Sequence, residues 1–131
     1  MTIPNGSDWV VVDSSGWVEY MGNGAKAGLF APYLESTENL LLPSIVVFEV
    51  YKKLLRESGK ELAEIFVSQA YALRERVIDF DLELSLLAAK TSLETHLPMA
   101  DAIIYATAHH HRARLITSDG HFANLPGVTL V

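Results

Sequence analysis

The sequence predicts an α/β fold in which helices cover both faces of a short, mainly parallel sheet. Short runs that are apolar throughout, as in strands buried on both faces, alternate along the chain with longer segments of helical character. The length of 131 residues, with 50% hydrophobic and 20% charged residues, suits a single globular domain. We therefore expect residues 9–131 to form one domain, preceded by a short N-terminal arm at residues 1–8.

Five short apolar runs, bounded by turn or helix-start residues, are the predicted strands. In chain order they are Trp9–Val12, Leu40–Leu42, Val77–Phe80, Arg114–Thr117 and Val128–Val131. The first run ends directly at Asp13, and the fourth leads into a turn-rich loop at residues 118–126. Because helical segments separate most of these runs, the connections favour parallel pairing.

The first two predicted helices are recognised by composition and by capping residues. Asn23–Glu35 consists mostly of helix-forming residues, with Pro32 as the exception. Ser44 stands at an N-cap position before the segment Ile45–Ser58, and Gly59 supplies a stop signal just beyond it. We expect about four helical turns in this second segment.

Apolar periodicity predicts the remaining helices. Lys60–Arg76 is expected to pack antiparallel to the preceding helix through a stripe of Leu62, Ile65, Phe66, Gln69, Ala70 and Leu73. Asp81 is placed to cap the next helix. The inward-facing residues of that helix are expected to be Leu82, Leu86, Ala89, Leu93 and Leu97. Pro98–His111 is the last predicted helix, and its alanine-rich face suits close packing.

The composition excludes several classes of protein. The absence of cysteine excludes disulfides, thiolate zinc sites, iron–sulfur clusters and a cysteine nucleophile. A formal charge of −6 excludes a globally basic nucleic-acid-binding surface, although a local basic patch remains compatible with it. No apolar run is long enough for a membrane-spanning helix, and the first residues lack the features of a signal peptide. A cytoplasmic location is therefore expected.

Four acidic residues occupy positions that suit a functional site. Asp13 follows the first predicted strand, and Asp119 follows the fourth after one intervening residue. In an open parallel sheet, ligands bind outside the carboxyl ends of the strands, so these two side chains are expected at the same edge. Glu49 and Asp101 lie on predicted helices. Glu49 stands within an apolar stretch, where an unpaired buried carboxylate is costly.

Each acid also has an ordinary structural explanation. Asp13 is suited to capping the helix that follows it, and Asp119 fits a turn. Asp101 in a first helical turn complements the helix dipole, and Glu49 has Lys53 four residues on for a surface ion pair. Individually, none of the four acids identifies a site.

Taken together and in this order, the four acids resemble those of the PIN-domain family of metal-dependent ribonucleases, in particular its VapC-type toxins. The likeness extends over nearly the whole chain and rests on residues 10–15 (VVVDSS), 43–50 (PSIVVFEV), 97–108 (LPMADAIIYATA) and 115–122 (LITSDGHF). The last two stretches are the most specific. They combine an aspartate between alanines on a helix with a strand ending in Thr-x-Asp and a phenylalanine three residues on.

This resemblance implies a three-layer α/β/α sandwich that uses Mg²⁺ or Mn²⁺ to hydrolyse RNA phosphodiester bonds. It also implies a homodimer and a cognate antitoxin whose tail occupies the active-site groove. Carried over by position, the family's acidic metal-binding residues are Asp13, Glu49, Asp101 and Asp119. Thr117 matches a hydroxyl residue two positions before the last acid, and Ser14 matches the small hydroxyl residue after the first.

Physical chemistry gives a reason for a metal in such a cluster. Carboxylates within about 5 Å of each other repel by roughly 3 kcal/mol per pair at an effective dielectric of 20, so the site must take up protons or cations. Hard divalent ions with oxygen ligands suit this composition. We expect Asp13 and Asp101 to be direct ligands, with Glu49 and Asp119 orienting water or completing a second metal position.

Two other functions remain open at this stage. An aspartate-based phosphohydrolase also has an aspartate after its first strand, but usually has a second two residues later, where this chain has Ser15. A metal-free binding module would use the acids only as caps and turn residues. Basic residues could flank a site, although a solvated helix face is the favoured interpretation: they are Lys52, Lys53, Arg56 and Lys60 near Glu49, and Arg112 and Arg114 after the Asp101 helix. His121, near Asp119, is likewise interpreted as an exposed loop residue.

Overall fold

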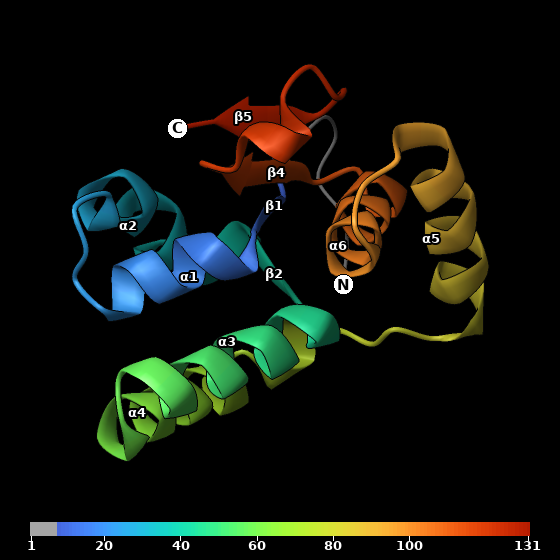
Figure 1. The fold of residues 1–131 in the computed structure, drawn as a ribbon. Helices are drawn as coiled ribbons and strands as arrows, with labels where there is room; N and C mark the ends of the chain where they lie inside the picture. The colour runs from blue at the N-terminus through green and yellow to red at the C-terminus, as the bar shows by residue number, and fades with distance from the viewer. Residues whose placement is uncertain (1–7) are drawn as a thin grey trace.

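A five-stranded parallel sheet forms the centre of the fold, in the strand order β3-β2-β1-β4-β5 (Figure 1). The computed structural model describes residues 8–131, so residues 1–7 of the expected arm lie outside the described part. The strands are β1 (Val10–Val12), β2 (Leu40–Pro43), β3 (Val77–Ile78), β4 (Arg114–Thr117) and β5 (Val128–Leu130). The predicted parallel α/β architecture is confirmed.

The central position of β1 determines where the sheet can hold a site. From β1 the chain proceeds through β2 to β3 on one side, and then crosses to β4 and β5 on the other. The boundary between β1 and β4 is therefore the point at which the strand order reverses, where ligands bind in open α/β sheets. Val12 pairs with Ile116, and the backbone N–H of Asp13 donates to the Ile116 carbonyl at 3.2 Å. The residues that follow β1 and β4 consequently start side by side.

Helices lie on both sides of this sheet. They are α1 (Ser14–Met21), α2 (Ala27–Glu35), α3 (Ser44–Glu57), α4 (Lys60–Ala72), α5 (Leu82–Thr95) and α6 (Met99–His110). Figure 1 shows α1 and α2 on one side of β1 and β4, with α5 and α6 on the other. Residues of the sheet such as Val11, Leu41 and Leu115 are fully buried between these layers.

The segment after β1 differs from the sequence-based expectation. Residues 14–21 form α1, whereas the helix expected at Asn23–Glu35 begins only at Ala27. A glycine four residues after the end of β1, Gly16, hides the helical pattern of α1, although its small size is required there. A Cβ atom at Gly16 would stand 2.6 Å from side-chain carbons of both Val12 and Phe30.

The second helical hairpin differs from the prediction at its ends. Ser44 is the first residue of α3 rather than its N-cap, and its Oγ accepts a hydrogen bond from the backbone N–H of Phe80 at 3.1 Å. Helix α4 ends at Ala72, and a 3₁₀ turn covers Arg74–Arg76. Of the predicted α4 stripe, Phe66 is buried, but Ile65 is 53% exposed.

The inward face predicted for α5 is wrong. Leu82, Leu86 and Leu93 are 77%, 60% and 80% exposed, and Ala89 is exposed as well. The helix instead buries Leu84 and Ala88, and the small Ala88 side chain packs with Ile103 and Ala106 of α6. Among the expected inward residues, Leu97 is buried, but it follows the end of α5. Asp81 does cap the helix, because its Oδ1 accepts from the Leu84 N–H at 2.9 Å.

Candidate metal centre

Asp13 lies at the end of β1 and is held by hydrogen bonds to both of its carboxylate oxygens. Its Oδ1 accepts from the Gly16 N–H at 2.9 Å, which caps α1. Its Oδ2 accepts from Ser15 Oγ at 2.9 Å and Thr117 Oγ1 at 2.6 Å. The residue is only 4% exposed. Burial raises the pKa of the Asp13 carboxyl, and these three hydrogen bonds oppose that effect.

Thr117 connects two of the predicted site acids. It is fully buried at the end of β4. While its hydroxyl donates to Asp13, the same oxygen accepts a hydrogen bond from the backbone N–H of Asp119 at 3.0 Å. One hydroxyl group thus fixes the Asp13 carboxylate and the start of the loop that carries Asp119.

Glu49 reaches the site from the second turn of α3. Its Oε1 accepts a hydrogen bond from Ser14 Oγ at 2.5 Å, which links α3 to the start of α1. The side chain is partly rather than fully buried, because Glu49 lies at the edge of the apolar face of α3. Among residues 8–131, no ion pair joins Glu49 to Lys53. The structure therefore does not contain the surface pair considered from the sequence.

Asp101 lies in the first turn of α6 and is the most perturbed acid of the group. Burial, followed by the nearby charges of Asp119, Glu49 and Asp13, raises the pKa of Asp101 to about 6, from an ordinary value of 3.8. Because the charges of three other acids act on the Asp101 carboxyl, all four acids lie close together. The cluster is therefore poised to take up a proton or a cation near neutral pH.

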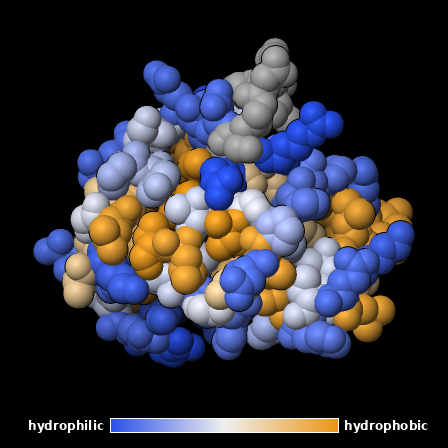
Figure 2. All heavy atoms as spheres, turned by 90° about the horizontal axis from the view of Figure 1, so that it is seen from above, coloured by the Kyte–Doolittle hydropathy of each residue, from blue (hydrophilic) through white to orange (hydrophobic). Residues whose placement is uncertain are grey.

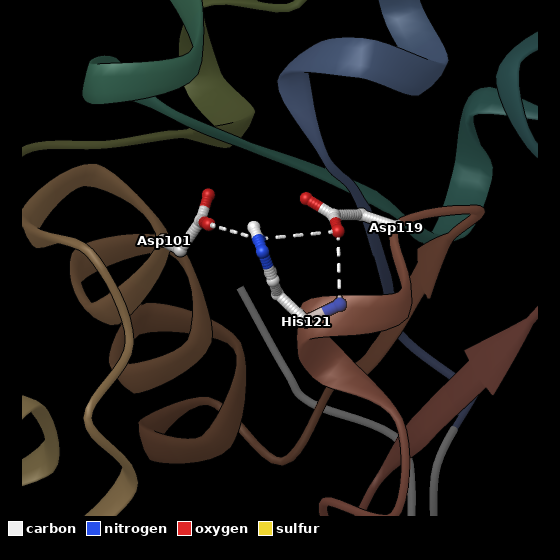
Figure 3. A group of neighbouring side chains, drawn as sticks. All are labelled: Asp101, Asp119 and His121. Carbon is white, nitrogen blue, oxygen red and sulfur yellow. Dashed lines mark hydrogen bonds and ion pairs between the residues drawn. The ribbon is translucent and has the colours of Figure 1, made fainter.

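Asp119 and His121 complete the group on the loop after β4 (Figure 3). Asp119 Oδ1 accepts from the His121 N–H at 2.9 Å and caps the 3₁₀ turn Gly120–Phe122. The His121 imidazole turns back toward the acids, with Nδ1 3.3 Å from Asp119 Oδ1 and 3.9 Å from Asp101 Oδ2. Asp101, Asp119 and His121 each offer one potential ligand atom, and these three atoms lie within 4.8 Å of one another. The sequence alone places His121 near Asp119. It does not show that His121 lies beside Asp101, because the packing of α6 against β4 sets the distance between these two residues.

A cavity of about 300 Å³ exposes the acids to solvent. Its charged lining has two parts: the four acids and a row of basic side chains from α3. The acids are Asp13, Glu49, Asp101 and Asp119, and the basic residues are Lys52, Lys53 and Arg56. The cavity therefore has acidic and basic side chains along one open surface, and three basic residues of α3 lie at the candidate site.

The expected structural roles of the acids are compatible with this arrangement. Asp13 and Asp119 do act as caps, and Asp101 does lie in a first helical turn. A carboxylate offers about four acceptor positions, and at Asp13 the capping and hydroxyl contacts occupy three of them. An acid of this kind can cap a helix and still contribute an oxygen to a cation.

Comparison with protein-family models decides the family. The model described as PIN domain matches residues 10–128, which is nearly the whole chain. The chain belongs to the PIN-domain family. A comparison with curated protein sequences gave no match.

Solved structures share the fold of this PIN domain at low sequence identity. A toxin–antitoxin complex from Klebsiella pneumoniae is 21% identical, with a TM-score of 0.74 over 92% of this chain and 95% of the other. VapBC2 from Rickettsia felis, bound to a promoter DNA fragment, is 18% identical, with a TM-score of 0.68 over 93% and 96%. The sarcin–ricin-loop-cleaving toxin VapC20 from Mycobacterium tuberculosis is 23% identical, with a TM-score of 0.70 over 91% and 96%. These likenesses establish the fold.

The donor set of this PIN domain fits a hard divalent cation. The four acids of the cavity offer oxygen ligands, which Mg²⁺ and Mn²⁺ prefer. Within residues 8–131, the Asp101 carboxylate accepts no hydrogen bond, and His121 Nδ1 at 3.9 Å is its nearest basic partner. A cation stabilises a partly buried carboxylate that accepts no hydrogen bond and is repelled by neighbouring acids. The described part of the chain contains no helix long and apolar enough to cross a membrane.

Proposed function

We propose that this PIN domain is a metal-dependent endoribonuclease and the toxin of a type II toxin–antitoxin pair. The observation that carries the proposal is the convergence of four carboxylates from separate segments on one open cavity, where burial and then the charges of the neighbouring acids raise the pKa of Asp101 to about 6. The matching family model and the toxin folds of the structural neighbours support the same function. The metal is proposed to be Mg²⁺, with Mn²⁺ as an alternative.

In this proposal Asp13 and Asp101 are direct metal ligands, and Glu49 and Asp119 orient the attacking water or complete a second metal position together with Asp101. A bound divalent ion lowers the pKa of water and stabilises the charge that develops on the phosphate and the leaving oxygen. Ser14 fixes Glu49 through the 2.5 Å hydrogen bond, so the Glu49 carboxylate presents its other oxygen to the cavity in a defined orientation. Thr117 holds Asp13 in the corresponding way. No side-chain nucleophile is needed for this hydrolysis.

The basic residues of α3 provide contacts for the RNA backbone. Lys52, Lys53 and Arg56 line the same cavity as the acids, so a phosphodiester in the cavity can contact both kinds of charged side chain. Phosphate contacts normally come from lysine and arginine, and a local row of such residues offsets the overall charge of −6. The RNA is therefore positioned by α3 and by the metal together.

A cognate antitoxin is the proposed protein partner. The structures from K. pneumoniae and R. felis are toxin–antitoxin complexes, and this chain covers more than nine-tenths of each matched chain. The charged cavity is open to solvent, which allows a partner segment to enter it and block the RNA. Inhibition by occupation of the cavity would need no change in the toxin fold.

We also propose that the protein forms a homodimer through α5. Leu82, Leu86 and Leu93 form an exposed apolar stripe along this helix. Figure 2 shows hydrophobic side chains at the right-hand edge of the molecule, the side on which α5 lies in Figure 1. Stripes of this kind mark association surfaces, and one helix face meeting its own copy gives a self-complementary contact.

Leu86→Glu is expected to convert the dimer to a monomer, because it places a charge in the centre of the stripe. Size-exclusion chromatography with light scattering measures the mass, and circular dichroism should show an unchanged fold because Leu86 is 60% exposed. Ile65→Glu on α4, at a residue that is 53% exposed, is the matched control and should remain dimeric. A wild-type protein that is monomeric at micromolar concentration would contradict the dimer.

RNA cleavage by the purified protein tests the proposed function. We expect endonucleolytic products from structured RNA with Mg²⁺ or Mn²⁺, and none in EDTA or with Asp13→Asn. Cleavage that continues in EDTA would exclude the metal mechanism. If RNA is not cleaved and millimolar metal does not change the melting temperature, the metal-free binding module is favoured. Release of phosphate from small phosphomonoesters would favour the phosphohydrolase.

A further inference from the structure

His121 occupies a position that the acidic residues alone do not explain. Its Nδ1 faces both Asp119 Oδ1, at 3.3 Å, and Asp101 Oδ2, at 3.9 Å (Figure 3). These acids come from the loop after β4 and from α6, so the imidazole stands where two separate elements meet. In the described part of the chain, no other side chain forms a hydrogen bond or ion pair with this ring.

The distances within this group match those between ligands of one ion. Oxygen and nitrogen ligands at about 2.1 Å from an octahedral ion lie about 3.0 Å apart when adjacent and about 4.2 Å apart when opposite. The two measured separations, 3.3 and 3.9 Å, fall between these limits. The imidazole can therefore share a cation with Asp101 and Asp119 after only small side-chain movements.

Contacts within its own loop fix the orientation of the His121 ring. The backbone N–H of His121 donates to Asp119 Oδ1 at 2.9 Å, which fixes the 3₁₀ turn that directs the ring toward the acids. Phe122, the next residue, is fully buried and anchors the turn in the core. The ring itself is exposed to solvent, so a hydrated ion can reach it.

We propose that His121 is a nitrogen ligand of the metal held by Asp101 and Asp119, and that it makes the site prefer Mn²⁺ to Mg²⁺. This inference rests on the proposed metal-dependent function. Magnesium strongly favours oxygen ligands, whereas the affinity of a nitrogen-containing site rises along the transition series that begins with Mn²⁺. A carboxylate-only site discriminates less strongly between the two ions. The preference for Mn²⁺ therefore depends on one side chain, His121.

Electron paramagnetic resonance of bound Mn²⁺ tests the inference directly, because a coordinated imidazole gives a ¹⁴N coupling that carboxylates cannot give. We expect this coupling in untagged wild-type protein and its loss in His121→Ala. The Mn²⁺ affinity of the variant should fall about tenfold or more, while its Mg²⁺ affinity changes less than about twofold. His110→Ala is the matched control, since that imidazole lies 3.6 Å from Glu83 Oε1, which is not one of the four site acids.

The outcomes separate this inference from the proposed function. Bound Mn²⁺ without a ¹⁴N coupling, or an equal loss of Mn²⁺ and Mg²⁺ affinity in His121→Ala, would overturn the role of His121 while metal-dependent RNA cleavage stands. Failure of wild type to bind either ion would overturn both. A coupling that disappears in His121→Ala but persists in His110→Ala supports the inference even if the RNA substrate has not been found.

Discussion

Asp101→Asn is expected to lower metal-dependent RNA cleavage more than about a hundredfold and, at the same time, to raise the melting temperature of the metal-free protein. Cleavage falls because asparagine removes the negative charge of a proposed metal ligand, and changes around metal sites cost tenfold to a hundredfold even outside the ligand set. Stability rises because Asp101 is repelled by Asp119, Glu49 and Asp13. A purely structural aspartate would not give these opposite effects.

The pH dependence of this gain follows from the pKa of Asp101. The folded protein raises this pKa from 3.8 to about 6, so it binds more protons than the unfolded chain between about pH 4 and pH 6. The free energy of unfolding of metal-free wild type therefore decreases as pH rises through this window and is constant, with respect to this group, above it. The free energy of unfolding of Asp101→Asn does not decrease in this way, because asparagine does not ionise. Its advantage should be largest at pH 7 and disappear below pH 4.

The size of the gain is limited by the partial exposure of the carboxyl. A tenfold change in proton affinity corresponds to about 1.4 kcal/mol, and solvent screening leaves about 1 kcal/mol of stability from the raised pKa of Asp101. A gain of this size raises the melting temperature by about 3–6 °C. Thermal melts in EDTA at pH 4 and pH 7 measure it. Asp79→Asn, the same substitution at an exposed position on the β3–α5 connection, is the control and should change neither property.

A lower melting temperature for Asp101→Asn at pH 7 would contradict this interpretation. It would mean that the Asp101 charge stabilises α6 through the helix dipole by more than the neighbouring acids destabilise it. Unchanged RNA cleavage would show, independently, that Asp101 is not a required ligand.

The sequence predicts the central sheet and its acids well because one physical rule governs both. Strands that are apolar throughout must be buried on both faces, which favours parallel pairing with helical connections. In such a sheet the residues after β1 and β4 share an edge, so Asp13 and Asp119 are brought together by topology alone. Glu49 and Asp101 needed the family resemblance, because a carboxylate on a helix carries no local signal of what it faces.

The face of α5 shows where periodicity alone becomes misleading. Leu82, Leu86 and Leu93 have helical spacing. Leu84 and Ala88 have it as well, and these are the two residues that the fold buries. The α6 surface opposite is rich in alanine, and the small Ala88 side chain of α5 packs there against Ile103 and Ala106. A large apolar stripe on a short helix predicts burial without specifying whether the burial is within the chain or between chains.

The 3₁₀ turn after β4 could not be predicted for a different reason. Whether His121 faces solvent or the acids depends on backbone angles over Gly120–Phe122 and on how closely α6 approaches β4. These are tertiary quantities, and a turn containing Asp and Gly is compatible with either orientation. The basic row of α3 is similar, because its place in the cavity depends on how α3 packs against α1 and α6.

Thr117→Val is expected to destabilise the protein and weaken metal binding together, although Thr117 itself contacts no solvent. Valine has a similar shape but removes the hydroxyl that donates to Asp13 Oδ2 and accepts from the Asp119 N–H. Two buried polar groups then lose a partner, which costs roughly 2–3 kcal/mol of unfolding free energy. Metal affinity should fall about tenfold to a hundredfold, the range for residues that orient ligands.

The pH profile of metal binding distinguishes this role from simple loss of packing. The hydrogen bond from Thr117 lowers the pKa of Asp13 against the opposing effect of burial, so its removal raises that pKa further. A metal ion competes with the proton for Asp13, and the variant should therefore require a higher pH for half-maximal binding than wild type. Thr117→Ser keeps the hydroxyl and loses only a methyl group, at a cost of about 1 kcal/mol. Calorimetric titration with Mn²⁺ from pH 5 to pH 8 should leave the serine profile unshifted, and equal shifts in both variants would show that the hydroxyl does not position Asp13.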